Sequence, residues 1–359
     1  MPELIETLIT MLVKIGVVFA TLLFVAAYLV WLERKVIADI QVRWGPTRVG
    51  PFGLLQPVAD GIKLFFKEDL IPGHVDRALF LLAPALSVIP AFLAFAVVPF
   101  GGTTTLFGLL SKPVPMYLAD IDVGVLYVFG ITSLGVYGIV LAGWSSNNKY
   151  SLLGGLRSSA QMVSYELSMS LSVVGVLLLV GSLRLTEIVK AQDGISWWLD
   201  IIPVSNWFIF SQPLAFVIFF TCALAETNRA PFDLPEAETE LVAGFHSEYS
   251  SMKFAMFFMA EYINMATASA MAATLFLGGP LPPPYLSSIF GGSGIFAPSP
   301  VWFVGKVLLL LFVFIWFRAS LPRFRYDQLM TFGWKRLLPL AFVNTILTAL
   351  AAAIVGVGR

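Results

Sequence analysis

The chain has 359 residues, of which 58% are hydrophobic and only 12% are charged. Its mean hydropathy is +0.85, and soluble globular proteins carry about 25% charged residues, so the composition excludes a soluble domain and indicates a membrane protein. Because the formal net charge is zero, the chain also lacks the basic surface that nucleic-acid binding requires.

Eight apolar runs are long enough to cross the hydrocarbon layer as helices, which takes about 20 residues each. No hydrophilic interval between them is long enough to hold a second core. The sequence therefore predicts an all-α, polytopic integral membrane protein in which residues 1–359 form a single transmembrane helical domain. The predicted spans are 8–32, 78–99, 121–143, 158–181, 207–225, 254–278, 301–317 and 337–357.

Most of the 22 basic residues fall after the odd-numbered spans. By the positive-inside rule that side is cytoplasmic, which places both termini on the outer, periplasmic side. The first residues carry Glu3 and Glu6 and no cationic segment. We therefore interpret the first apolar run as an uncleaved span and not as a signal peptide.

The interval after the first span is too apolar for a plain loop. Between Gly53 and Lys67 apolar residues recur at helical spacing, while polar ones take the other face. This pattern predicts an amphipathic helix lying against the membrane surface. Its role is either anchoring alone or the passage of a ligand.

Two further intervals carry local predictions. Asp120 and Asp122 precede the third span, where they are expected to cap the helix. Residues 143–157 read as a short polar cytoplasmic interval, and the region from 278 to 300, which is uncharged and rich in Pro and Gly, reads as an irregular cover on the outer side.

Three carboxyl groups lie in or at the end of predicted spans. Glu166 lies about 13 Å and Glu261 about 10 Å from the cytoplasmic end of its span, and Glu226 stands at the inner end of the fifth. An ionisable residue at such a depth is costly and indicates function, here proton carriage, although a structural acid paired with a cation is the alternative.

An acidic stretch at 226–248 follows on the cytoplasmic side. Pro231 and Pro235 end the preceding helix, and a new helix is expected near Leu234, on which Glu236 and Glu240 share a face. Together with Glu238, these acids either form a solvated loop or the mouth of a hydrated carboxylate path that continues to Glu226, Glu261 and Glu166.

The basic patch at 318–328 follows the seventh span. We expect Arg318 to orient the helices and Arg323 and Arg325 to dock an acidic partner surface.

Metal ligands are scarce. The chain has one cysteine, Cys222, inside a span, and its two histidines, His74 and His246, lie outside the spans. A cysteine-ligated iron–sulfur cluster, a zinc site of the finger type and a bis-histidine haem are therefore not expected.

Several strings together closely resemble the H-subunit family of proton-pumping NADH-quinone oxidoreductase, respiratory complex I. The likeness covers nearly the whole chain. The strings are Glu33-Arg34-Lys35 and residues 43–50, 59–69, 143–154, 164–166, 226–238 and 318–328.

The resemblance implies that the first span, the amphipathic helix and the sixth span frame an entry channel for quinone. It also implies that a chain of carboxylates couples quinone reduction to proton translocation. The implied channel residues are Glu33, Arg34, Arg43, Asp60, Lys63, Arg229 and Phe232. The implied proton-pathway residues are Glu166, Glu226, Glu236, Glu238, Glu240 and Glu261.

By the same resemblance the chain is a subunit of an NADH:quinone oxidoreductase in a bacterial cell inner membrane, with no redox centre of its own. FMN and the iron–sulfur clusters would lie in partner subunits, which include the peripheral-arm subunits of the quinone site and antiporter-like membrane subunits. The Glu-Thr-Asn-Arg form at 226–229 favours ubiquinone over menaquinone as the substrate.

Two other interpretations also explain buried carboxyls. One is a secondary ion transporter or channel, although we find no internal repeat. The other is a membrane anchor subunit of a related hydrogenase complex.

Overall fold

The structure of the protein, a computed structural model, describes residues 2–104, 114–198, 202–233, 243–283 and 297–355. Each of the eight predicted spans corresponds to a helix in the described parts of the chain. The helices are α1 (Pro2–Ile40), α3 (Arg77–Ala94), α4 (Gly124–Ser145), α5 (Lys149–Val180), α8 (Pro213–Glu226), α10 (Ser251–Phe276), α12 (Pro300–Ser320) and α14 (Leu338–Val355).

Six helical stretches are long and apolar enough to cross a membrane by length and composition. The two remaining predicted spans correspond to α8, which has 14 residues, and α10, which has 26 residues but carries Lys253, Glu261 and Asn264. The prediction of an all-helical polytopic membrane protein is confirmed, and the two helices that depart from the simple apolar pattern both carry predicted site residues.

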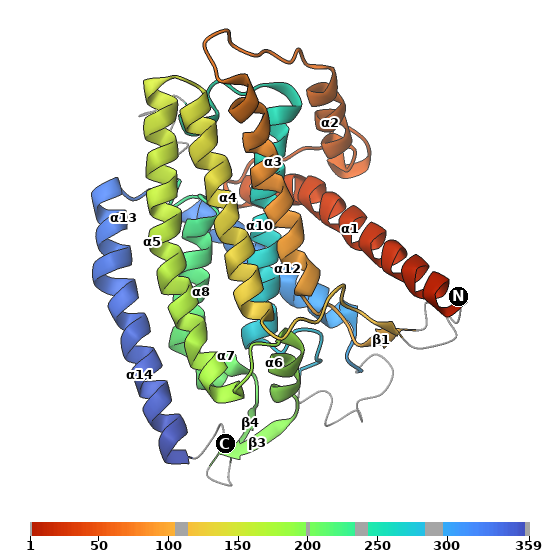
Figure 1. The fold of residues 1–359 in the computed structure, drawn as a ribbon, viewed down its shortest axis with the longest axis vertical. Coiled ribbons are helices and arrows are strands. Elements are labelled where there is room, and N and C mark those ends of the chain that lie inside the picture. Colours follow the sequence, from red (N-terminus) through yellow and green to blue (C-terminus); the bar gives the residue numbers. More distant parts are fainter. Residues whose placement is uncertain (1, 105–113, 199–201, 234–242, 284–296, 356–359) are drawn as a thin grey trace.

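The long helices pack mostly side by side. Figure 1 shows α3, α4, α5 and α14 running along the long axis, with α8 and α10 among them, whereas α1 leans away. The largest cluster of buried apolar side chains draws on α5, α8, α10 and α12, with Phe219, Phe276 and Phe314 fully buried. The carboxyl-bearing helices are thus the packed centre of the molecule.

The predicted amphipathic helix is present as α2 (Gln56–Phe66). A 3₁₀ turn, η1 (Pro51–Gly53), precedes it, and Figure 1 shows α2 near the C-terminal end of α1. The α2 segment also contacts α10. Its apolar residues Val58, Ile62, Phe65 and Phe66 are exposed, as expected for a helix at a membrane surface.

The polar interval predicted at 143–157 is wrong in its extent, because α4 continues to Ser145 and α5 begins at Lys149. The Asn148 side chain caps the new helix by accepting from the backbone N–H of Tyr150 at 3.0 Å. In the first turns of α5 the small residues Ser151, Gly154, Gly155 and Ser158 are the buried ones, and hydropathy does not reveal their burial.

The prediction that Asp120 and Asp122 cap α4 is also wrong. The N-cap residue is Val123, and no side chain caps the helix. Asp122 instead pairs with Arg184, and Asp120 accepts a hydrogen bond from Thr186 at 3.0 Å. The Asp122 carboxylate raises the pKa of Arg184 through this hydrogen bond, and the two aspartates join the loop before α4 to the segment after α5.

Short elements complete the described chain at the helix ends. Two antiparallel hairpins pair β1 (Thr103–Thr104) with β2 (Val114–Pro115) and β3 (Ile195–Trp198) with β4 (Ile202–Ser205). The short helices are η2 (Phe95–Val97), α6 (Leu185–Ala191), α7 (Phe208–Ser211), η3 (Gly244–His246), α13 (Tyr326–Phe332) and the π-helical turn η5 (Gly333–Leu337).

The η3 turn packs directly against α5 at Gly154. A Cβ placed there would lie 2.7 Å from the Cα of Gly244 and 2.9 Å from the backbone N of Phe245. We expect Gly154→Ala to lower the free energy of unfolding by about 1–3 kcal/mol, because backbone must move to relieve the overlap. Thermal or denaturant unfolding in mild detergent measures the change.

Gly135→Ala is the matched control. Gly135 also lies within a transmembrane helix, and a Cβ there would meet nothing within 4 Å. Equal loss of stability in both variants would contradict the close packing of η3 on α5.

Candidate functional site

A large cavity of about 940 Å³ lies between α1, α2 and α10. Pockets that bind small molecules occupy about 300–1,000 Å³ and are mostly apolar with a few polar groups. Much of this wall is apolar, including Ala26, Val30, Leu64, Phe258 and Met259. Charged residues from α1, α2, α12 and the turn after α8 complete it.

A buried ionic cluster lies at this cavity, centred on Glu33 of α1. Its carboxylate pairs with Arg318 of α12, lies 3.6 Å from Nη1 of Arg229, and accepts a hydrogen bond from the Tyr262 hydroxyl at 2.9 Å. The guanidinium carbon of Arg229 lies 4.3 Å from the centroid of the Tyr262 ring. The side chains of Glu33 and Arg229 are only 7% and 6% exposed, so water screens this cluster weakly.

Arg229 connects the cluster to a second carboxylate, Glu261 of α10, with which it forms an ion pair. Arg229 lines the large cavity, while Glu261 lines a separate small cavity of about 40 Å³. The ion pair therefore stands between the two cavities.

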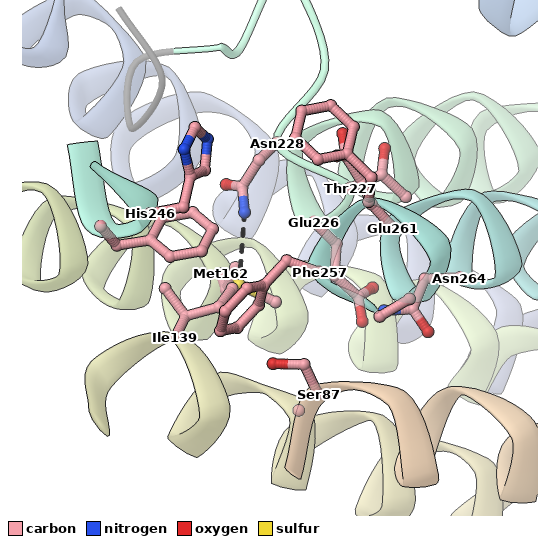
Figure 2. A pocket seen from close by; sticks show the side chains of 14 residues that line it. Ser87, Ile139, Met162, Glu226, Thr227, Asn228, His246, Phe257, Glu261 and Asn264 are labelled. Carbon is pink, nitrogen blue, oxygen red and sulfur yellow. Dashed lines mark hydrogen bonds between the residues drawn. The ribbon is translucent and has the colours of Figure 1, made fainter. Parts of the chain in front are cut away.

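The small cavity brings Glu261 together with Glu226. Figure 2 shows its lining residues, which come from α8 and α10 and from α3, α4, α5 and η3. Glu226 in turn is close enough to Glu166 of α5 to interact with it electrostatically. Glu166 is hydrogen-bonded to Ser133 of α4. Glu226 thus has carboxyl groups of both α5 and α10 near it.

The turn after α8 positions Arg229. Gln161 of α5 donates to the backbone carbonyls of Ala225 and Phe232, each at 2.8 Å, and thereby ties both ends of the turn to α5. Asn228, whose φ is +50°, donates to Ser158 at 3.0 Å. The residues between Glu226 and Asp233 are held by these contacts and do not form a loose loop.

Asp60 organises the charged side of α2. It pairs with Arg34 of α1 at 3.0 Å and with Lys63 at 3.5 Å, and it accepts from Gln56 at 3.1 Å. This ion pair fixes α2 to α1 at the cavity wall, where its charges are more exposed than the Glu33 cluster.

The turn before α10 is fixed by Tyr249. Its ring stacks on Phe80 with centroids 4.0 Å apart, and its hydroxyl lies 3.3 Å from the Ser145 hydroxyl. Burial raises the pKa of Tyr249 to about 12, so the group stays neutral at physiological pH. This contact orders the turn that carries His246 into the small cavity.

Within the part of the chain that the structure describes, no group of three or more His, Cys, Asp and Glu side chains is arranged to hold a metal ion. The charged residues of the site pair with one another instead.

Comparisons with known proteins identify the family. The family described as NADH dehydrogenase matches residues 13–349. The chain is 56% identical to one of the NADH-quinone oxidoreductase H subunits of Koribacter versatilis, over 97% of this chain and 98% of the relative. The chain belongs to the H-subunit family of NADH-quinone oxidoreductase.

Two further relatives in the H-subunit family show similar identity and coverage. An NADH-quinone oxidoreductase H subunit of Geobacter sulfurreducens is 52% identical, over 96% of each chain. The corresponding H subunit of Thermomicrobium roseum is 54% identical, over 93% of each chain. The resemblance found in the sequence is confirmed, and this membership favours the oxidoreductase over the transporter and the hydrogenase anchor.

Most residues that the resemblance associated with a quinone channel line the large cavity of this H-subunit family member. They are Glu33, Arg34, Arg43, Asp60, Lys63 and Arg229. Phe232 is not among the lining residues. It is buried, and the centroid of its ring lies 5.6 Å from that of Tyr165 and 5.4 Å from that of Phe324. This packing stabilises the turn behind the site.

The other predicted residues have different outcomes. Glu236, Glu238 and Glu240 lie outside the described residues, as does the helix expected near Leu234. Arg323 donates to Asp233 of the same chain at 2.8 Å, whereas Arg325 has a side chain that is 80% exposed. Docking of a partner by these arginines stays a prediction.

Sequence reasoning missed several members of the site. Arg318, which we expected only to orient the helices, pairs with Glu33, and Tyr262 also binds Glu33. Asn264 lines the small cavity three residues after Glu261. The signal for Asn264 was present, because polar residues at i and i+3 share a face of an otherwise apolar helix.

The buried cluster predicts a high cost in stability for neutralising its central carboxylate, Glu33. Glu33→Gln leaves Arg229 and Arg318 without their shared counter-charge in a poorly solvated place, and breaking a buried pair in this way costs about 3–5 kcal/mol. We expect a clearly lower midpoint of thermal unfolding for the variant in mild detergent.

Asp122→Asn provides the comparison, because Asp122 also pairs with an arginine but its side chain is 76% exposed. We expect little change in the midpoint of thermal unfolding of this variant. A Glu33→Gln variant as stable as Asp122→Asn would contradict the structural importance of the Glu33 cluster.

Proposed function

We propose that this H-subunit family member admits a quinone into the large cavity between α1, α2 and α10. The cavity volume of about 940 Å³ and its largely apolar wall suit a lipid-soluble ring and part of its tail. The charged end formed by Glu33, Arg229 and Arg318 supplies polar groups for the quinone oxygens. The Glu-Thr-Asn-Arg form at 226–229 makes ubiquinone the proposed substrate.

Reduction of a quinone to a quinol consumes two electrons and two protons. In our proposal the electrons come from NADH through FMN and iron–sulfur clusters in partner subunits, and this chain binds neither. Its own residues guide the quinone and hold protons and charge. This division matches a chain with a single cysteine and two histidines.

The observation that carries the proposal is the Arg229–Glu261 ion pair between the two cavities. Negative charge that develops on a quinone in the large cavity competes with Glu261 for the Arg229 guanidinium. A carboxylate that loses its cation in a poorly solvated place binds a proton instead. Electron transfer is thereby converted into proton uptake without a large movement of the chain.

The proton moves along coupled carboxyls in this proposal. Glu261, Glu226 and Glu166 form the membrane-embedded part, and their protonation changes as a group because each group senses the charge of its neighbour. Glu236, Glu238 and Glu240 complete the path at the cytoplasmic mouth in our proposal. The path leads towards antiporter-like membrane subunits that carry the protons across.

The proposed setting is a bacterial inner membrane. The positive-inside distribution supports an orientation with the basic loops in the cytoplasm and both termini in the periplasm. Residues 1–359 act as one helical domain, and Arg323 and Arg325 dock the peripheral arm. The exposed guanidinium of Arg325 supports that role.

Obstruction of the large cavity tests the quinone proposal. Gly61 of α2 lines this cavity, and a Cβ there meets nothing within 4 Å. We expect Gly61→Trp in the assembled complex to raise KM for ubiquinone several-fold. A photoreactive ubiquinone should label residues 23–64, with labelling reduced in the variant and by excess ubiquinone.

Gly305→Trp is the matched control, because Gly305 is an exposed helical glycine with equal space and lies outside the cavity. We expect its KM to be unchanged. Unaltered KM and labelling in Gly61→Trp would refute quinone binding in this cavity.

A second measurement tests the carboxylate path. We expect Glu166→Gln to lower proton pumping and quinone reductase activity in reconstituted vesicles, since a neutral amide cannot carry the proton. Glu187→Gln, which removes an exposed outer carboxylate near Arg184, should leave both unchanged. Normal pumping by Glu166→Gln, at the wild-type ratio of protons to electrons, would contradict the proposed path.

A further inference from the structure

Asn264 occupies a place in the site that the proposed function does not use. It lies on α10 between Glu261 and Thr267 at intervals of three residues, so these polar side chains share one face of the helix. The surrounding residues of α10 are mostly apolar and buried, including Ile263, Met265 and Ala266. A polar stripe on such a helix implies that polar groups lie on the side that faces it.

Two small cavities adjoin at this stripe. The first, of about 40 Å³, contains Glu261 in its wall, and the second, of about 30 Å³, contains Thr267 and Thr132. Glu226, Thr227 and Asn264 line both. Figure 2 shows the Asn264 side chain near that of Glu226 in the first cavity. Asn264 therefore stands where the two cavities meet, beside the middle carboxyl of the proposed path.

The Oδ1 atom of Asn264 and the Oγ1 atom of Thr267 are buried and have no hydrogen-bond partner among the described residues. A buried polar atom without a partner is costly, and water commonly satisfies it where space allows. A water molecule needs about 10–15 Å³ of such space, so the first cavity has room for about three or four waters and the second for about two or three.

We propose that Asn264 is a positioning residue that holds ordered water between Glu261 and Glu226. Its amide both donates and accepts hydrogen bonds and does not titrate, so it holds the water whichever carboxyl carries the proton. The proton passes from Glu261 through the water to Glu226, and Asn264 itself gains and loses none. Thr267 orients further water in the second cavity.

This inference rests on the proposed carboxylate path and is tested beside it. We expect Asn264→Leu, which keeps the volume but removes both hydrogen-bonding groups, to lower proton-coupled turnover about tenfold. That is less than the ~10²–10⁴-fold effect of a group that transfers the proton itself. KM for ubiquinone should be unchanged, and the solvent deuterium isotope effect on turnover should increase.

Asn264→Ser distinguishes hydrogen bonding from packing. Serine is smaller but polar, and the space it leaves admits another water, so this variant should keep most of the turnover and a normal isotope effect. Wild-type turnover and isotope effect in Asn264→Leu would overturn the inference, and so would equal damage in Asn264→Ser. If Asn264→Leu does not assemble, a high-resolution map of the wild-type protein decides, because water within about 3 Å of Oδ1 is required.

Glu226→Gln, measured in parallel, separates this inference from the proposed function. If Glu226→Gln abolishes coupled pumping while Asn264→Leu pumps as the wild type does, the carboxylate path stands and the role of Asn264 is refuted. If Glu226→Gln pumps normally, the path itself fails and the inference with it.

Discussion

The structure depends on how one guanidinium is shared. Arg229 lies between Glu33 and Glu261, which belong to different helices and face different cavities. Burying such charges is costly, and the cost is offset only when the partners and hydrogen bonds are well placed. Tyr262, Arg318 and the turn held by Gln161 supply that placement.

The arrangement also explains why the helices that carry the site are the least typical spans. The short α8 ends at Glu226, so that the turn bearing Arg229 enters the packed centre, and α10 carries Glu261 and Asn264 at positions where a plain span would be apolar. Away from Glu226 and Glu261 both helices return to buried apolar residues such as Phe219 and Phe276. Packing there fixes the helices, and the charged groups lie towards the turn that bears Arg229.

Hydropathy alone located each long helix, because length and apolar content determine where a chain crosses a membrane. It missed the start of α5, because Ser151, Gly154 and Ser158 are buried by close packing and not by hydrophobicity. The membrane carboxyls were likewise evident as charges in apolar runs. Their partners were not, because Glu33, Arg229 and Arg318 are far apart in sequence and only the tertiary fold brings them together. The resemblance grouped several of these residues, but it also included Phe232, which lies away from the cavity.

If charge in the large cavity is answered by proton binding at Glu261, reduction of a bound quinone protonates this carboxylate. Infrared difference spectroscopy of the assembled complex, recorded while bound ubiquinone is reduced, tests it directly. We expect a new protonated-carboxyl band that is absent in Glu261→Gln and altered when Arg229 is replaced by Met. The same band at full strength in Glu261→Gln would contradict proton binding at Glu261.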